Sequence, residues 1–120
     1  CIATAFTGGY TRIILVNSGG IANNSVIRGT QNVYGTSNDT EIYGNVGTEN
    51  VGSGGVSNRT KVFKAGTLNV LNGGTANDAT IYNDAYLHVF AGGAAYNVFK
   101  DSRAQITVDA GGIITYRSVE

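Results

Sequence analysis

The sequence predicts an all-β fold in which units of about 19 residues stack as the rungs of a β-solenoid. Gly-Gly pairs recur at a constant interval, and a valine stands three positions before each pair. The chain also contains 18 glycines and no proline, which favours many tight turns between short strands. A unit this short cannot bury an apolar face alone. Stacked units can, because each strand pairs with the same strand one unit later. The pairs are Gly54-Gly55, Gly73-Gly74, Gly92-Gly93 and Gly111-Gly112.

The composition limits the classes of protein and of partner. A chain of 120 residues forms one domain at most, or part of a longer array. Charged residues make up only 13%, the net charge is zero, and lysine and arginine are scattered, so we expect no nucleic-acid partner. No apolar run is long enough for a membrane span, and no signal-peptide pattern opens the chain. Cys1 is the only cysteine, which excludes an intramolecular disulfide and leaves its own role open.

The valines fix the frame of the repeat. Four of them keep the same interval as the glycine pairs, and two earlier ones continue the series at slightly shorter intervals. We expect residues 16–120 to form the repeats and residues 1–15, which break the period, to form an irregular segment or a cap. The valines are Val16, Val33, Val51, Val70, Val89 and Val108.

A second column lies two residues before each valine and therefore on the same face of the same strand. Together the two columns predict a continuous core. Gln31 and Glu49 are the exceptions, since a buried polar side chain needs a partner unless the strand tilts outward there. The column consists of Ile14, Gln31, Glu49, Leu68, Leu87 and Ile106.

A second strand in each unit is predicted to bury Val26, Ile42, Val62 and Ile81. Asparagines precede it, and we expect Asn23, Asn38, Asn58 and Asn77 to form a structural ladder at the turns. The residue after each core position should point outward by alternation. This places Ile27, Tyr43, Phe63 and Tyr82 in an exposed stripe, which predicts an interaction surface. The alternative is that these rings pack against neighbouring loops.

Opposite charges also fall on adjacent rungs in this register, which supports it independently. The expected pairs are Glu41 with Lys61, Arg59 with Asp78, and Asp84 with Arg103.

Three stretches, "SGGIANNSVIRGTQNVYG", "GTENVGSGGVSNRT" and "AGTLNVLNGGTANDATI", resemble the repeats of self-associating autotransporter adhesins, the AIDA-I, TibA and antigen 43 group. The resemblance implies a right-handed parallel β-helix, display on the bacterial outer membrane or secretion, and self-association, biofilm formation or host-cell adhesion. The family's signal sequence and membrane barrel are not found, so an excised passenger segment is expected. Lys100 departs from the pattern, because it occupies the second apolar column. A charged residue at this position predicts local bulging there.

Some members of this family carry heptose on serine or threonine side chains of the repeats. The resemblance therefore implies candidate O-glycosylation sites at comparable repeat positions. They are Ser18, Ser25, Ser53 and Ser57.

We expect no enzyme activity, no cofactor and no metal. His88, the only histidine, lies between two core positions and should point to solvent, and no nucleophile elbow accompanies it. The aspartates fall in different columns, unlike those of a calcium-binding solenoid. Two alternatives to a structural adhesin segment stay open. One is a glycan-binding module whose outward aromatics stack on sugars, and the other is a polysaccharide-degrading β-helix enzyme.

Overall fold

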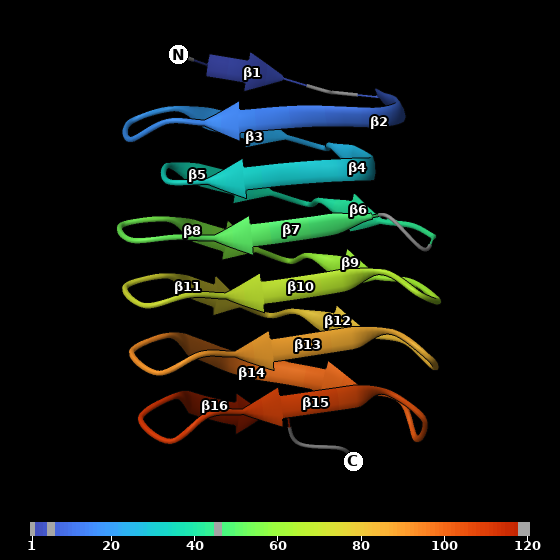
Figure 1. Ribbon diagram of the computed structural model, residues 1–120, viewed down its shortest axis with the longest axis vertical. Coiled ribbons are helices and arrows are strands. Elements are labelled where there is room, and N and C mark those ends of the chain that lie inside the picture. Colours follow the sequence, from blue (N-terminus) through green and yellow to red (C-terminus); the bar gives the residue numbers. More distant parts are fainter. Residues whose placement is uncertain (1, 5–6, 45–46, 118–120) are drawn as a thin grey trace.

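The computed structural model describes residues 2–4, 7–44 and 47–117, and in this part the chain forms stacked parallel strands and no helix (Figure 1). In Figure 1 the chain descends from the N-terminus while the front strands run to the left and the strands behind them run to the right. This sense of rotation makes a right-handed coil. The predicted right-handed parallel β-helix is therefore confirmed, and its longest dimension is 35 Å.

Each rung has three sides, and every strand pairs in parallel with its equivalent on the next rung. The front strands are β2 (Thr7–Val16), β4 (Val26–Val33), β7 (Thr48–Val51), β10 (Thr67–Val70), β13 (Tyr86–Val89) and β15 (Gln105–Val108). The back strands are β1 (Ile2–Thr4), β3 (Ile21–Asn23), β5 (Thr36–Asn38), β8 (Val56–Asn58), β11 (Thr75–Asn77), β14 (Ala94–Lys100) and β16 (Ile113–Tyr116). The short side consists of the start of β4, then β6 (Glu41–Ile42), β9 (Lys61–Val62), β12 (Thr80–Ile81) and the end of β14.

The valine column lies in the core as predicted, because the front strands stack in register. Val51, Val70 and Val89 pair with one another in order and are fully buried. The prediction that Val108 lies in the core is wrong, since 37% of its surface is exposed. It belongs to β15, the last front strand that the structure describes, and no described rung covers it from the other side. Ile106 in the same strand is only partly buried.

On the short side, the predicted core column of the second strand was wrong by one residue at its first member. Ile27, not Val26, pairs with Ile42, and it is 1% exposed. Ile27 therefore belongs to the core column that continues through Val62 and Ile81, and it is not part of an outward stripe.

Two kinds of corner connect the sides. After the front strands, a turn such as Leu71–Gly74 is closed by a bond from the Gly74 amide to the Leu71 carbonyl, with φ of +82° at Gly73. Glycine at this position fits a type II turn. Between the back and short sides, one residue in the left-handed region turns the chain. These residues are Asn24, Asp39, Arg59, Asp78 and Asn97.

The interior contains a polar layer around Glu49, which is fully buried. One carboxylate oxygen accepts hydrogen bonds from Gln31 Nε2 at 2.7 Å and Ser37 Oγ at 2.8 Å. The other accepts from Ser57 Oγ at 2.8 Å and Thr60 Oγ1 at 3.1 Å. The strand does not tilt outward, because four donors satisfy the buried carboxylate.

This polar layer interrupts the apolar core on part of the rung, while the short-side column of Ile27 and Ile42 continues past it as part of the larger cluster. On its N-terminal side lies a small apolar cluster of Val16, Ala22 and Val33. The larger apolar cluster includes Leu68, Val70 and their equivalents on later rungs.

The regular stack changes near β14. The pairing of β14 with β16 shifts between Ala95 and Val98, and Val98 is buried. Lys100 pairs with Ile81 as the sequence predicts, but its side chain is exposed. At the other end, β1 pairs in parallel with β3 and β2 with β4. Whether residues 1–15 act as a cap stays a prediction.

Candidate interaction surface

The outward aromatic column of the short side is built from three stacked rings. The Tyr43 and Phe63 ring centres lie 4.5 Å apart with planes 1° from parallel, and Phe63 and Tyr82 lie 4.9 Å apart at 13°. Arg28, which takes the place predicted for Ile27, lies over the Tyr43 ring with 5.3 Å between its guanidinium carbon and the ring centre. The three rings are half-buried. Tyr43 and Phe63 therefore present ring edges rather than ring faces to solvent.

This geometry bears on the glycan-binding alternative. A sugar stacks on the face of an aromatic ring. Both faces of Phe63 are covered by its neighbouring rings, and both faces of Tyr43 are covered by Phe63 and Arg28. The Tyr43 hydroxyl also donates to Glu41 Oε1 at 2.9 Å. Burial, and secondarily this bond to Glu41, raises the pKa of Tyr43. The aromatic column is thus mainly a contact between rungs, with its edges available to a partner.

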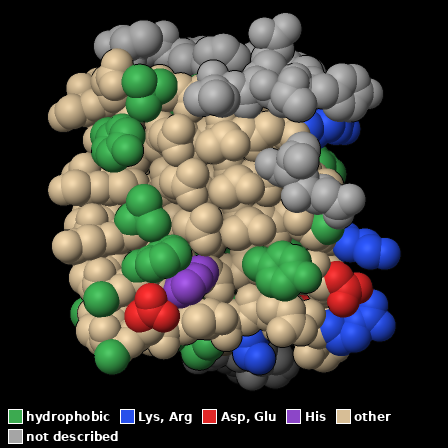
Figure 2. All heavy atoms as spheres, viewed as in Figure 1, with side chains coloured by type: hydrophobic (Ala, Val, Ile, Leu, Met, Phe, Trp, Pro, Cys, Tyr) green, Lys and Arg blue, Asp and Glu red, His purple; other side chains and the backbone are tan. Residues whose placement is uncertain are grey.

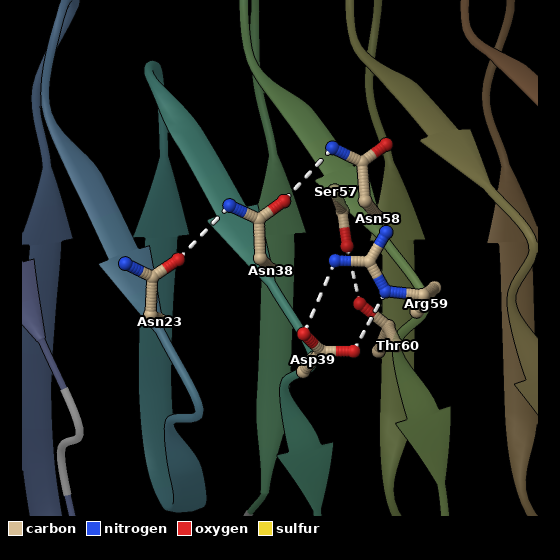
Figure 3. A network of polar contacts seen from close by, with 7 residues as sticks. All are labelled: Asn23, Asn38, Asp39, Ser57, Asn58, Arg59 and Thr60. Carbon is tan, nitrogen blue, oxygen red and sulfur yellow. Dashed lines mark hydrogen bonds and ion pairs between the residues drawn. The ribbon is translucent and has the colours of Figure 1, made fainter.

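Charged side chains run beside the aromatic column. The Arg59 guanidinium donates two hydrogen bonds to the Asp39 carboxylate, at 2.7 Å to Oδ1 and 3.1 Å to Oδ2. Figure 3 shows this pair. This hydrogen bond lowers the pKa of Asp39 and raises the pKa of Arg59. The predicted partner of Arg59 was Asp78, which instead accepts a bond from Asn97 Nδ2 at 2.5 Å. Arg59 thus pairs with the preceding rung rather than the following one.

The other two predicted charge pairs have different outcomes. Asp84 and Arg103 form an ion pair of 3.0 Å, as expected. Glu41 and Lys61 stand at paired positions of β6 and β9, but no ion pair joins them among the described residues. Lys61 is exposed, and its charge contributes to the lowered pKa of Asp39, but its side chain forms no hydrogen bond or ion pair in that part of the chain.

A shallow groove of about 440 Å³ lies among these charges. It contains both signs of charge, and in the described part of the chain no group of three or more histidine, cysteine, aspartate or glutamate side chains could hold a metal ion. Asp39 and Asp78 do share a corner column, contrary to the sequence prediction, but Arg59 separates them. The groove is lined by Asp39, Arg59, Lys61, Asp78, Thr80, Asn97 and Arg117.

The predicted asparagine ladder exists on the back side. Asn38 donates to Asn23, Asn58 to Asn38 and Asn77 to Asn58, at 3.0 to 3.1 Å, and Figure 3 shows its first three members. The front side carries a second ladder that the sequence analysis missed. There Asn50 donates to Asn32 at 3.0 Å and Asn69 to Asn50 at 2.9 Å. The recurring T-x-N-V of residues 30–33, 48–51 and 67–70 was the signal for it.

The front side is mostly polar and uncharged, as the broad area without red or blue side chains in Figure 2 shows. His88 occupies the position that follows Asn69 in the second ladder. Its Nε2 lies 3.1 Å from Asp109 Oδ1 and its ring stacks on Phe90 at 3.8 Å. It points outward as expected, but it is half-buried rather than freely solvated.

The serine candidates for glycosylation separate into two groups. Ser18 and Ser53 are exposed at the corners after the front strands. Ser25 and Ser57 are fully buried, and Ser57 donates to Glu49. An enzyme cannot reach a buried hydroxyl in the folded solenoid, so burial favours Ser18 and Ser53 over Ser25 and Ser57 as acceptors. Alternation along the rung explains this, because both side chains point inward.

Comparison with known proteins supports the fold and the resemblance. No family model matches the chain, and no curated protein sequence matches it. Among solved structures, the chain is similar to a hyper-glycosylated TibA fragment whose glycosylation was catalysed by TibC, with a TM-score of 0.76 and 27% identity. The chain resembles the passenger repeats of TibA-type autotransporter adhesins. The match covers 87% of this chain but only 39% of the TibA fragment. No described helix is long and apolar enough to cross a membrane.

Proposed function

We propose that this chain is a segment of a bacterial surface adhesin, displayed at the outer membrane or secreted, whose solenoid associates with other copies of itself. The similarity to the TibA fragment carries this proposal. The resemblance implies that such self-association leads to autoaggregation and biofilm formation, with host-cell adhesion as a further role. The fold suits this role, because every rung repeats the same outward columns and a weak contact can recur along the stack.

We assign the contact to the short side, where the aromatic edges lie beside both signs of charge. Tyr43, Phe63 and Tyr82 remain in this surface, and Arg28 replaces Ile27. A net charge of zero leaves little overall repulsion between identical molecules. The covered faces of Tyr43 and Phe63 make a glycan-binding module the weaker alternative.

The test replaces Tyr43, Phe63 and Tyr82 together with serine in the chain displayed on bacterial cells. Cell–cell aggregation should fall while the amount displayed stays the same, and protease resistance checks that the solenoid remains folded after the ring contacts between rungs are lost. A matched control replaces Tyr34, an exposed tyrosine at the corner after β4, with serine and should leave aggregation unchanged. Undiminished aggregation of the triple variant would move the contact to another face, with the asparagine ladders as the next candidates.

We also propose Ser18 and Ser53 as O-glycosylation acceptors, since both are exposed at equivalent corners and the similar TibA fragment is hyper-glycosylated. Co-expression with a glycosyltransferase of the TibC type should add sugar to these two serines and none to Ser25 or Ser57. Peptide mass spectrometry measures this directly. Modification of Ser25 or Ser57 would contradict the buried positions assigned to them.

A further inference from the structure

The charges on the short side are arranged in bands that follow the rungs. Four consecutive rungs present three outward columns each, and we call these twelve residues the banded strip. Its first row is Asn24, Val26 and Arg28; its second is Asp39, Glu41 and Tyr43; its third is Arg59, Lys61 and Phe63; its fourth is Asp78, Thr80 and Tyr82. The formal charges of the rows are +1, −2, +2 and −1, taken from the residue types in the sequence.

This order of charges is antisymmetric about the boundary between the second and third rows. Reversing the order of the rows changes the sign of every band and leaves its size the same. A surface with this property is complementary to itself when a second copy lies against it upside down. Two-fold contacts between identical subunits require this kind of self-complementarity.

The symmetry operation follows from the geometry of the strip. A two-fold axis that lies in the contact plane and runs along the strands reverses the solenoid axis but keeps the strand direction. Each outward column then faces the same column of the second copy, with its rows in reverse order. Glu41 faces Lys61 of the second copy, and Tyr43 faces Phe63.

We propose that the banded strip docks on the banded strip of a second, antiparallel copy of this chain, about a two-fold axis that passes between β6 and β9. This pairing rests on the self-association proposed above and specifies its surface and register. The outer rows also match, since Arg28 faces Tyr82 and Asn24 faces Asp78. Lys61 is exposed and forms no hydrogen bond or ion pair among the described residues, so its ammonium group is available to the second copy.

The contact is small. Four rungs at a spacing of about 4.8 Å and five residues at about 3.3 Å each span roughly 300 Å² per copy. This is well below the area of a stable dimer interface, so we expect one pair of strips to bind weakly. Adhesion then depends on many copies held close together on a surface, which raises the effective concentration.

The experiment uses beads coated densely with the full 120-residue chain, in two colours. Lys61→Glu places two like-charged pairs across the contact, and so does Glu41→Lys. Each variant alone should lower clustering with itself by about tenfold or more, because like charges facing each other oppose binding. Beads carrying Lys61→Glu mixed with beads carrying Glu41→Lys should cluster with each other, since positions 41 and 61 of one copy then face residues of opposite charge in the other. Circular dichroism and protease resistance verify that each variant is folded.

Two further samples define the specificity. The double variant, Glu41→Lys with Lys61→Glu, should cluster with itself and not with wild type. The control Lys64→Glu makes the same change in net charge at an exposed position on the next corner and should cluster like wild type.

Each outcome has a definite meaning. Wild-type beads that stay separate overturn self-association and the pairing with it. Wild-type beads that cluster, with reversals that have no effect, overturn the pairing and leave self-association standing. Reversals that lower clustering without rescue in the mixture overturn the antiparallel register. A misfolded variant cannot produce the rescue.

Discussion

At the scale of single residues, Glu49 shows how the interior accommodates a buried carboxyl group. The residues around it change together along the chain. Glu49 lies against Ser57 and Thr60, and one rung later the same three positions are Leu68, Ala76 and Ala79. The stack therefore contains a polar and an apolar version of the same interior layer. In the polar version the side chains hydrogen-bond to one another, and in the apolar version none of these side chains is polar.

This correspondence predicts the effect of breaking the layer. Glu49→Leu alone should destabilise the chain by about 1–3 kcal/mol for each buried donor left without an acceptor. A variant that converts the whole layer to its apolar version should be as stable as wild type, or more stable by about 1–4 kcal/mol. Denaturant unfolding measures both. A whole-layer variant less stable than Glu49→Leu would contradict the account. The changes are Gln31→Leu, Ser37→Ala, Thr40→Ala, Glu49→Leu, Ser57→Ala and Thr60→Ala.

The Asp39–Arg59 pair predicts a dependence on pH. In the folded state, the hydrogen bond from Arg59 lowers the pKa of Asp39 below its ordinary value of 3.8. A group with a lowered pKa contributes stability above its unfolded-state value and loses it as the pH falls through the folded-state value. Thermal unfolding of wild type and Arg59→Gln should therefore differ above pH 3.8 and converge well below it. A difference that persists in acid would mean that Arg59 acts through packing instead.

The sequence could not choose the partner of Arg59. Aspartate occupies the same corner position on the rung before it and on the rung after it, so both pairings satisfy the repeat. Side-chain geometry decides between them. In contrast, the burial of Leu68 and Leu87 was predictable, because leucines that recur at the period of the repeat are expected to face the core.

At the scale of elements, the Gly-Gly pairs combine two different requirements. The first glycine has positive φ, +80° at Gly54. The second, Gly55, has ordinary φ, but a Cβ placed on it would collide with the Val33 carbonyl oxygen of the preceding front strand. One position therefore needs glycine for its conformation and the other for space.

This difference predicts unequal effects of alanine at the two positions. Gly54→Ala meets nothing closer than 3.9 Å, so it should cost only the left-handed conformation, about 1–2 kcal/mol. Gly55→Ala should cost more, because backbone must move to make room. Thermal unfolding of the two variants measures the order, and a smaller effect at Gly55 would show that the corner yields easily.

The short side shows what a repeat pattern leaves open. The front-side valines recur regularly enough to fix their register, but the rung that ends at Ile42 is shorter, since Ile42 follows Ile27 more closely than Val62 follows Ile42. Val26 and Ile27 are both apolar, so hydrophobicity alone does not choose which of them faces inward. The outward column was consequently misplaced at its first member, and Arg28 was missed.

At the scale of the whole molecule, the polar layer predicts uneven stability along the stack. Each rung contacts mainly its neighbours, so local stability follows the packing between adjacent rungs. The apolar cluster on the N-terminal side of Glu49 is small, whereas the cluster around Leu68 and Leu87 is large. Amide hydrogen exchange in β3 and β5 should therefore precede exchange in β10 and β13. Equal protection of all four strands would show that the polar layer does not weaken the stack.

The pairing proposed above, in which one copy recognises another in antiparallel register, would connect this fold to adhesion, and disulfide trapping tests it most directly. In a Cys1→Ser background, one sample carries Val26→Cys and another carries Thr80→Cys, the residues that face each other across the proposed two-fold axis. Oxidation of an equal mixture at high density should give mixed dimers far in excess of either homodimer. Homodimers in excess would indicate parallel copies, and the absence of any dimer would remove the banded strip from the contact.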